Sequence, residues 1–189
     1  MSGSRDRTIR LWDAAAGGAP VFVIETPSPV NTIHSSAILS AADSSNGIGN
    51  SGNSFLLACG LANGCCQMRD LRVPSRVLVE WQPHNEEIRS IHLHPSLPLI
   101  LSGSYDSTVA LTTLSTQGGA IDLQQISNTH KVGVHLDKVV KCCWHSSSQV
   151  PLSFLSASAD KTVVCWVQQQ YQPLQKSTTG HLPSSSRRN

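Results

Sequence analysis

The sequence predicts an all-β protein built from a repeated hairpin. Short runs of apolar and β-branched residues alternate with turns rich in Gly, Pro, Asp and Asn, and no stretch has helical periodicity. The clearest unit is LSFLSASADKTVVCW, residues 152–166, in which two such runs flank a polar turn. We therefore expect short antiparallel strands joined by tight turns.

The second observation is that this hairpin recurs. Equivalent segments read SGSRDRTIRLWD (2–13), CGLANGCCQMRD (59–70) and SGSYDSTVALTT (102–113). Superposition of the four segments aligns three columns: Asp6, Asn63, Asp106 and Asp160; Thr8, Cys65, Thr108 and Thr162; and Trp12, Arg69, Thr112 and Trp166. The spacing between turns is close to the unit length of a propeller blade once insertions are allowed.

These residues resemble the WD40 repeat, in which a histidine precedes the first strand of each unit. His84 and His135 stand in that position before the third and fourth turns. The resemblance implies a partial β-propeller of about three blades plus part of a fourth. Since a closed seven-bladed ring needs roughly 300 residues, we expect this chain to be the C-terminal part of a longer protein.

The expected organisation follows the repeats. Residues 1–13 form the last hairpin of a truncated repeat, and residues 14–70 a degenerate repeat with the Asn63 turn. Complete repeats span residues 71–113 and 114–167. The insertion 35–54 and the tail 168–189 are rich in Ser, Asn, Gln and Pro, and this composition predicts disorder.

Strands are expected wherever the apolar runs occur. The third and fourth repeats give the most regular pattern, with strands at Ile88–Leu93, Leu99–Ser102 and Val109–Thr112, followed by Ile121–Ile126, Val139–Trp144, Phe154–Ser156 and Thr162–Val167.

The resemblance also implies a structural hydrogen-bonded tetrad, formed in the last repeat by His135, Ser156, Asp160 and Trp166. Partial tetrads are expected at His84, Ser102 and Asp106, and at Ser2, Asp6 and Trp12. Such a network would satisfy polar groups that are costly to bury unpaired. Thr112 replaces the tryptophan of the His84 set, so we expect that blade to be held less firmly.

The tetrad contains the three residue types of a Ser-His-Asp catalytic triad, so a hydrolase is a further hypothesis and the least favoured one. A serine at this position would face the packed interior. We therefore predict no catalytic residues and a non-enzymatic protein.

Possible metal ligands stand close together at Cys142, Cys143 and His145, and at His92 and His94, which raises a metal site as a hypothesis. Neither group has a second pair of ligands at zinc-site spacing. His92 and His94 share one face of a strand, and we expect this face to be either exposed or packed beside a neighbouring blade. No metal or cofactor is predicted, and the six cysteines are expected to be buried thiols in strands.

Net charge is +2, with 14% charged residues and no long Lys/Arg run, so we predict no nucleic-acid partner. No apolar run approaches about 18 residues, and no secretory leader is recognisable, which favours a cytoplasmic protein without membrane insertion. A partial ring leaves apolar faces bare, so the isolated fragment should self-associate.

The run from Cys59 to Trp166 resembles the terminal blades of neuronal, microtubule-associated WD-repeat proteins. This implies a protein–protein interaction scaffold in microtubule or cytoskeleton regulation, with microtubule-associated proteins as partners. The alternative is a substrate receptor of a ubiquitin ligase, because Arg69-Asp70-Leu71-Arg72 resembles the adaptor-docking box of such receptors. Arg69 replaces its tryptophan, and a solvated strand end is the expected structure there.

Overall fold

The computed structural model describes residues 1–13, 15, 17–36, 56–117, 120–145 and 152–167. Every regular element in these residues is a strand, which confirms the all-β prediction. The expected disorder of the insertion and of the tail lies outside the described residues, except that Ser35 and Ser36 end a strand. The strands are β1 (Ser2–Gly3), β2 (Thr8–Trp12), β3 (Pro20–Glu25), β4 (Val30–Ser36), β5 (Leu56–Leu61), β6 (Cys66–Asp70), β7 (Val77–Trp81), β8 (Ile88–Leu93), β9 (Leu99–Ser104), β10 (Thr108–Gln117), β11 (Ala120–Val134), β12 (Val139–His145), β13 (Ser153–Ser158) and β14 (Val163–Val167).

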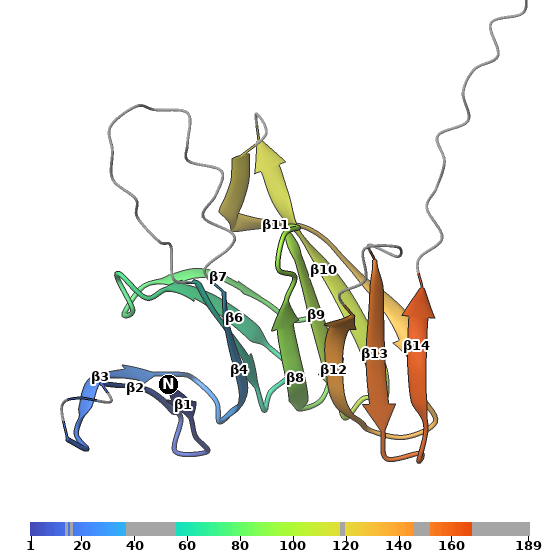
Figure 1. The fold of residues 1–189 in the computed structure, drawn as a ribbon, viewed down its shortest axis with the longest axis horizontal. Coiled ribbons are helices and arrows are strands. Elements are labelled where there is room, and N and C mark those ends of the chain that lie inside the picture. The colour runs from blue at the N-terminus through green and yellow to red at the C-terminus, as the bar shows by residue number, and fades with distance from the viewer. Residues whose placement is uncertain (14, 16, 37–55, 118–119, 146–151, 168–189) are drawn as a thin grey trace, which may run out of the picture.

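The strands form four antiparallel sheets in which consecutive strands are neighbours (Figure 1). Sheets β4–β7 and β8–β11 have four strands each, whereas β1–β3 and β12–β14 have three within the described residues. The outer strands β3, β7 and β11 lie in segments that the expected repeat boundaries assign to the following repeat. On those boundaries the first three sheets each combine strands of two successive repeats, whereas β12–β14 all lie in residues 114–167.

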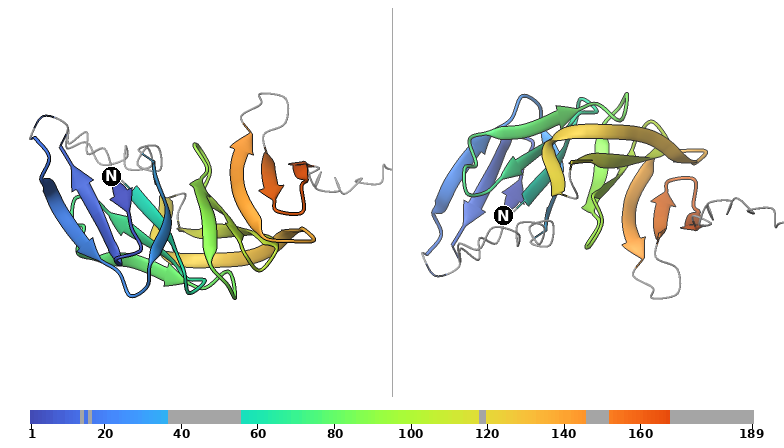
Figure 2. Two further views of the ribbon diagram at one scale, coloured as in Figure 1. Left: turned by 90° about the horizontal axis from the view of Figure 1, so that it is seen from below. Right: turned by 90° about the horizontal axis from the view of Figure 1, so that it is seen from above.

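The sheets stand side by side in chain order (Figure 2), with β4 against β8 and β8 against β12. Apolar side chains fill the space between each pair of neighbours. β5 is buried along its whole length because its sheet is covered on both faces. The clusters are centred on Ile9, Ile24, Val30, Leu57, Cys59 and Leu61; on Leu56, Met68, Ile88, Ile91, Ile100 and Leu114; and on Leu101, Val109, Val139, Cys142 and Phe154.

Neighbouring sheets come closest at one repeated position. A Cβ atom added to Gly60 would lie 2.5 Å from a methyl group of Ile88, and one added to Gly103 would lie 2.7 Å from a methyl group of Val139. Gly3 approaches Val30 in the same way. The equivalent residue of the last sheet is Ala157, which is half-buried. Glycine is thus used where a β-branched residue of the next sheet lies directly over the strand.

The hairpin of β10 and β11 is longer than expected. The predicted strands Val109–Thr112 and Ile121–Ile126 extend to Thr108–Gln117 and Ala120–Val134. The pairing continues through register shifts after Val109, Thr113 and Leu114. β-bulges of this kind absorb unequal strand lengths, and β11 has more residues than β10.

The two outermost sheets leave apolar side chains uncovered. On β14, Val163 is 70% exposed and Val167 is 56% exposed, while Val164 and Trp166 on the opposite face are half-buried. Val21 and Val23 are exposed on β3 in the first sheet. No helix in the described residues is long and apolar enough to cross a membrane.

We predict that Gly60→Ala will destabilise the fold by about 1–3 kcal/mol, because the new methyl group overpacks the contact with Ile88 and Thr32. Denaturant unfolding checks this value. Ala157→Ser at the half-buried equivalent position is the matched control and should change stability much less. Equal losses of stability in the two variants would mean that the close contact between sheets is not the reason for glycine at position 60.

Candidate functional site

The aspartate column marks a turn with one shared geometry. Asp6, Asp106 and Asp160 each accept hydrogen bonds from the backbone N–H and the hydroxyl of the threonine two residues later; the hydroxyl bonds are 2.6 Å long in all three turns. In the degenerate turn the side-chain oxygen of Asn63 accepts only from the N–H of Cys65, at 3.2 Å. A side chain that caps its own turn explains why these residue types recur there.

The residue between the aspartate and the threonine adopts a left-handed backbone. Arg7, Ser107 and Lys161 have φ values of 64°, 65° and 70°. Gly64 takes this place after Asn63, with φ of 82°, and a Cβ atom there would collide with the backbone oxygen of His84. The weakest of the four sequence matches therefore keeps the turn conformation by using glycine.

The last sheet brings together His135, Ser156, Asp160 and Trp166. The indole N–H of Trp166 donates to Ser156 Oγ at 2.7 Å, His135 Nε2 lies 2.7 Å from the same oxygen, and His135 Nδ1 lies 3.0 Å from Asp160 Oδ2. One proton arrangement satisfies every group: the serine hydroxyl donates to Nε2, and Nδ1–H donates to the carboxylate. The network ties the loop before β12 to the β13–β14 hairpin.

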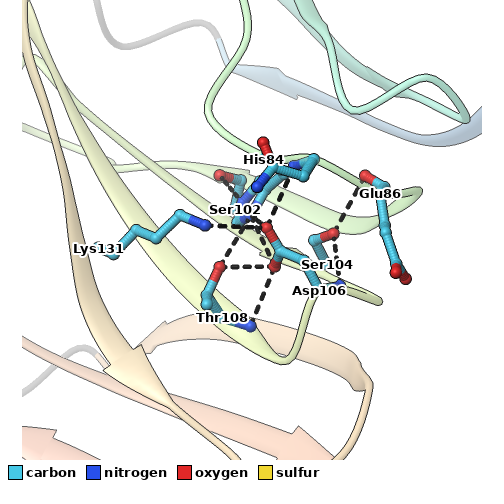
Figure 3. Close-up of polar contacts among 8 residues, drawn as sticks. His84, Glu86, Ser102, Ser104, Asp106, Thr108 and Lys131 are labelled. Carbon is cyan, nitrogen blue, oxygen red and sulfur yellow. Dashed lines mark hydrogen bonds and ion pairs between the residues drawn. The ribbon is translucent and has the colours of Figure 1, made fainter.

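The third sheet contains a second network around His84, Ser102 and Asp106 (Figure 3). His84 Nε2 lies 2.9 Å from Ser102 Oγ, and its Nδ1 lies 3.1 Å from both Asp106 oxygens. Lys131 of β11 adds an ion pair to Asp106 at 3.1 Å, a contact that no sequence signal indicated. The carboxylate of Asp106 therefore has a cationic partner that Asp160 lacks among the described residues.

The protonation states of His84 and Asp106 follow from their burial and their hydrogen-bond partners. Desolvation lowers the pKa of the His84 imidazole, and Asp106 opposes the shift. For Asp106, burial acts to raise the pKa, but hydrogen bonds from Thr108, Lys131 and the Asn85 N–H, together with the electrostatic interaction with His84, hold it below its usual value. A neutral imidazole donating Nδ1–H to a carboxylate is the consistent state near pH 7.

In the third sheet Thr112 stands at the tryptophan position, and a tryptophan of the second sheet bonds to it instead. Thr112 is buried and accepts a hydrogen bond of 3.1 Å from the indole N–H of Trp81 on β7. Its hydroxyl also lies 3.1 Å from that of Thr129 on β11. The position thus links the second sheet to the third, which argues against the expected loosening of the blade.

The first sheet holds the other partial set. Trp12 donates its indole N–H to Ser2 Oγ at 2.8 Å, and Asp6 pairs with Arg10 at 2.6 Å. Asp6 and Trp12 do not share a partner in the structure. Only the serine–tryptophan half of the network is therefore present here.

Arg69, expected at a solvated strand end, is only 3% exposed, and that expectation is wrong. Its guanidinium donates to Gln67 at 2.9 Å, to the Pro74 and Ser75 carbonyls, and to the Glu25 carbonyl of the first sheet at 3.4 Å. Gln67 in turn donates to Glu80. The arginine replaces tryptophan in the column by reaching two backbone oxygens of its own β6–β7 loop and one of the adjoining sheet.

Two Ser-His-Asp constellations thus exist, at Ser156 and at Ser102. Each serine is 1% exposed, and Ser156 Oγ also receives the Trp166 indole. A nucleophile must reach a substrate carbonyl, and neither hydroxyl has access to one. The geometry supports a role in holding the hairpins.

The histidines weighed as metal ligands lie between inner strands. His92 of β8 packs against His34 of β4 with ring centroids 4.0 Å apart and ring planes tilted by 41°, and His94 packs edge-on against Trp144 of β12 at 4.7 Å. The His94 Nδ1 accepts the N–H groups of Ser96 and Leu97. In the described residues no group of three or more candidate ligands surrounds a metal position.

All six cysteines are free thiols, with Cys59, Cys66 and Cys142 buried and Cys65 and Cys143 half-buried. Cys165 on β14 is exposed, so the expectation of burial is wrong for that residue. Cys65 lies just before β6 rather than within a strand. Burial raises the pKa of Cys59 to about 11 and that of Cys142 to about 12, which makes both thiols poor nucleophiles at neutral pH.

A family model described as "WD domain, G-beta repeat" matches residues 1–13, 75–111 and 127–167. The matched segments contain the Asp6, Asp106 and Asp160 turns together with His84 and His135. The segment between residues 13 and 75, which contains Asn63 and Arg69, lies outside the match. The match therefore follows the turns in which an aspartate and a threonine are both present.

Ser156→Ala should lower the free energy of unfolding by about 1–3 kcal/mol, because it leaves the Trp166 indole N–H and His135 Nε2 without their shared partner in a buried position. Denaturant titration measures the loss. Ser2→Ala is the matched control: Ser2 is exposed, and water can replace its bond to Trp12. A hydrolase activity abolished by Ser156→Ala in a protein of undiminished stability would contradict the structural role.

The His34–His92 pair predicts loss of stability in mild acid. Desolvation, His34 and Lys141 lower the pKa of His92 from its ordinary 6.5 to about 4. The folded state therefore binds fewer protons than the unfolded state between these values, and stability falls as pH drops from about 6.5 towards 4. His92→Gln should reduce this dependence in unfolding titrations at pH 7 and pH 5, whereas His145→Gln, at an exposed position, should preserve it. An unchanged pH slope in His92→Gln would refute the assignment.

Proposed function

We propose, from the WD40 repeats that this chain carries, that it is a non-enzymatic scaffold for other proteins. The observation that carries the proposal is that the histidine, serine and aspartate side chains of the last two sheets hydrogen-bond to one another inside the protein. What remains for partners is the surface of sheets, edges and loops. WD40 domains generally act as interaction platforms of this kind, and the matched repeats support the same role here.

The finer proposal is a role in microtubule or cytoskeleton regulation, with a cytoplasmic, cytoskeleton-associated location. It is supported by the resemblance of residues 59–166 to the terminal blades of nemitin, a neuronal WD-repeat protein that associates with microtubule-associated proteins. A net charge of +2 is small for direct electrostatic binding to an acidic tubulin surface. A microtubule-associated protein is therefore the proposed link.

The alternative, a ubiquitin-ligase substrate receptor, is supported by the pairing of Asp70 with exposed Arg72 at 2.6 Å, which resembles the charged end of an adaptor-docking box. Arg69 at the box's tryptophan position is buried and faces the first sheet. The docking box would thus lack its aromatic residue. This weakens the alternative relative to the scaffold.

We predict that the protein co-sediments with microtubules when a microtubule-associated partner is present and poorly without one. Pelleting assays with purified tubulin, with and without that partner, measure this. Equal pelleting in both conditions would contradict the indirect link. Proximity labelling in cells that recovers ligase adaptors and no cytoskeletal proteins would favour the alternative.

The isolated 189-residue chain should self-associate, because the valines on β3 and β14 present uncovered apolar sheet faces to water. Sedimentation velocity over a range of concentrations should show a rising average mass. A single monomeric species with a cooperative thermal melt at every concentration would refute this.

A further inference from the structure

The loop that joins β6 to β7, residues 71–76, is a basic segment with the sequence LRVPSR. Four of its side chains are exposed, namely those of Arg72, Val73, Ser75 and Arg76. The corresponding connections of the first and third sheets are DAAAGGA before β3 and GG before β11. Joining a third strand to a fourth therefore does not require arginine or serine.

The loop is held from its inner side and carries a serine on its outer side. The guanidinium of buried Arg69 donates to the carbonyls of Pro74 and Ser75 at 3.1 and 3.4 Å. The side chain of Ser75 is exposed, and among the described residues its hydroxyl has no hydrogen-bond partner. This hydroxyl is therefore open to a reagent from solvent.

The residues before this serine match the chemistry by which some protein kinases choose a substrate. An arginine three positions before a serine or threonine occurs twice in the sequence, as Arg72 before Ser75 and as Arg5 before Thr8. Kinases that prefer basic substrates bind such an arginine with carboxylates of their peptide groove, because guanidinium–carboxylate hydrogen bonds are strong. The acceptor hydroxyl must also be free to attack ATP.

The second match lacks a free hydroxyl. Thr8 is half-buried, and its hydroxyl donates to Asp6 Oδ1 at 2.6 Å. Its backbone N–H donates to the same oxygen, and the residue begins β2, which pairs with β3. Reaching Thr8 would require this hairpin to open, so the structure favours Ser75.

The Ser75 loop can open without disturbing its sheet. Its turns are closed by the N–H of Val73, which bonds to the Asp70 carbonyl, and by the N–H of Arg76, which bonds to the Val73 carbonyl. The pairing of β6 with β7 begins outside the loop, at Arg69 and Val77. Local opening of a few exposed bonds costs much less than opening a hairpin.

We propose that Ser75 is a phosphorylation site for a protein kinase that recognises Arg72. Ser75 Oγ forms a bond to the γ-phosphorus of ATP while the bond from that phosphorus to the β,γ-bridging oxygen breaks, and ADP leaves with the electron pair. The hydroxyl proton passes to the catalytic aspartate of the kinase. The proposal goes beyond the scaffold function and does not depend on it.

Phosphorylation would change the charge pattern of the loop. A phosphate on Ser75 carries a charge of about −1.5 to −2 at neutral pH and can bond to nearby guanidinium groups. Arg72 already bonds to Asp70 through its Nε and Nη2 atoms. The phosphate would compete with Asp70 for this arginine, and the modification would thereby alter the charged end of the Arg69-Asp70-Leu71-Arg72 segment.

The test incubates the purified whole chain with MgATP and the catalytic subunit of cAMP-dependent protein kinase, a kinase of basic specificity. Mass spectrometry of proteolytic peptides should locate phosphate on Ser75 and none on Thr8. Ser75→Ala should abolish the modification at this loop, and Ser75→Thr should retain it. Arg72→Gln should lower the initial rate about tenfold or more, because the kinase loses a charge-assisted contact.

Arg5→Gln is the matched control for charge. Arg5 is also exposed and also stands three residues before a hydroxyl, so its loss should leave the rate at Ser75 within about twofold of wild type. Thermal melts establish that all variants are folded. Equal losses of rate in Arg5→Gln and Arg72→Gln would overturn recognition of Arg72.

Peptides with the sequences of residues 69–78 and 2–11, RDLRVPSRVL and SGSRDRTIRL, separate recognition from access. Phosphorylation of the first peptide without phosphorylation of Ser75 in the folded chain would show that the loop is closed to the kinase. Modification of Thr8 in the folded chain as fast as Ser75 would show that a free hydroxyl does not decide the site. No phosphorylation of the first peptide would exclude recognition itself. Each of these results overturns the proposal and leaves the scaffold function standing.

Discussion

The structure depends on a carboxylate in the third sheet and on another in the last sheet. Each holds the loop that leads into its sheet against a hairpin of that same sheet. Asp160 caps its own turn through Thr162 and binds His135 from the loop before β12, and Asp106 does the same with Thr108 and His84. The hydroxyls of Ser104 and Ser158, which donate to the Glu86 and Asp137 carbonyls, hold the same loops. Together these bonds fix the loops that precede Ile88 and Val139, the residues that lie over Gly60 and Gly103.

Where the signature residues are absent, neighbouring sheets supply the missing contacts. Trp81 donates to Thr112 across the second and third sheets, and Arg69 reaches the Glu25 carbonyl across the first and second. In both cases a contact between sheets is added to contacts within one sheet. Sequence degeneracy in a repeat is therefore compatible with firm packing.

The sequence predicts the strands well because three of the four repeated hairpins carry an aspartate cap and a threonine at the turn, and the fourth has Asn63-Gly64 there. The grouping of His135, Ser156 and Trp166 was also foreseeable, since the repeat supplies their spacing. Burial of Arg69 and the ion pair of Lys131 with Asp106 were not foreseeable from spacing. Both depend on how sheets face one another, and that relation involves residues dozens of positions apart.

The sharing of strands between repeats has a consequence for how such a chain can change length. On the repeat boundaries expected from the sequence, β3 belongs to the second repeat but completes the sheet of the first, and β7 and β11 stand in the same relation to their own sheets. Excision of one sequence repeat would move a foreign outer strand onto the preceding sheet. A splice variant or recombinant is thus tolerated only when the imported strand matches its new neighbour in register and in buried face.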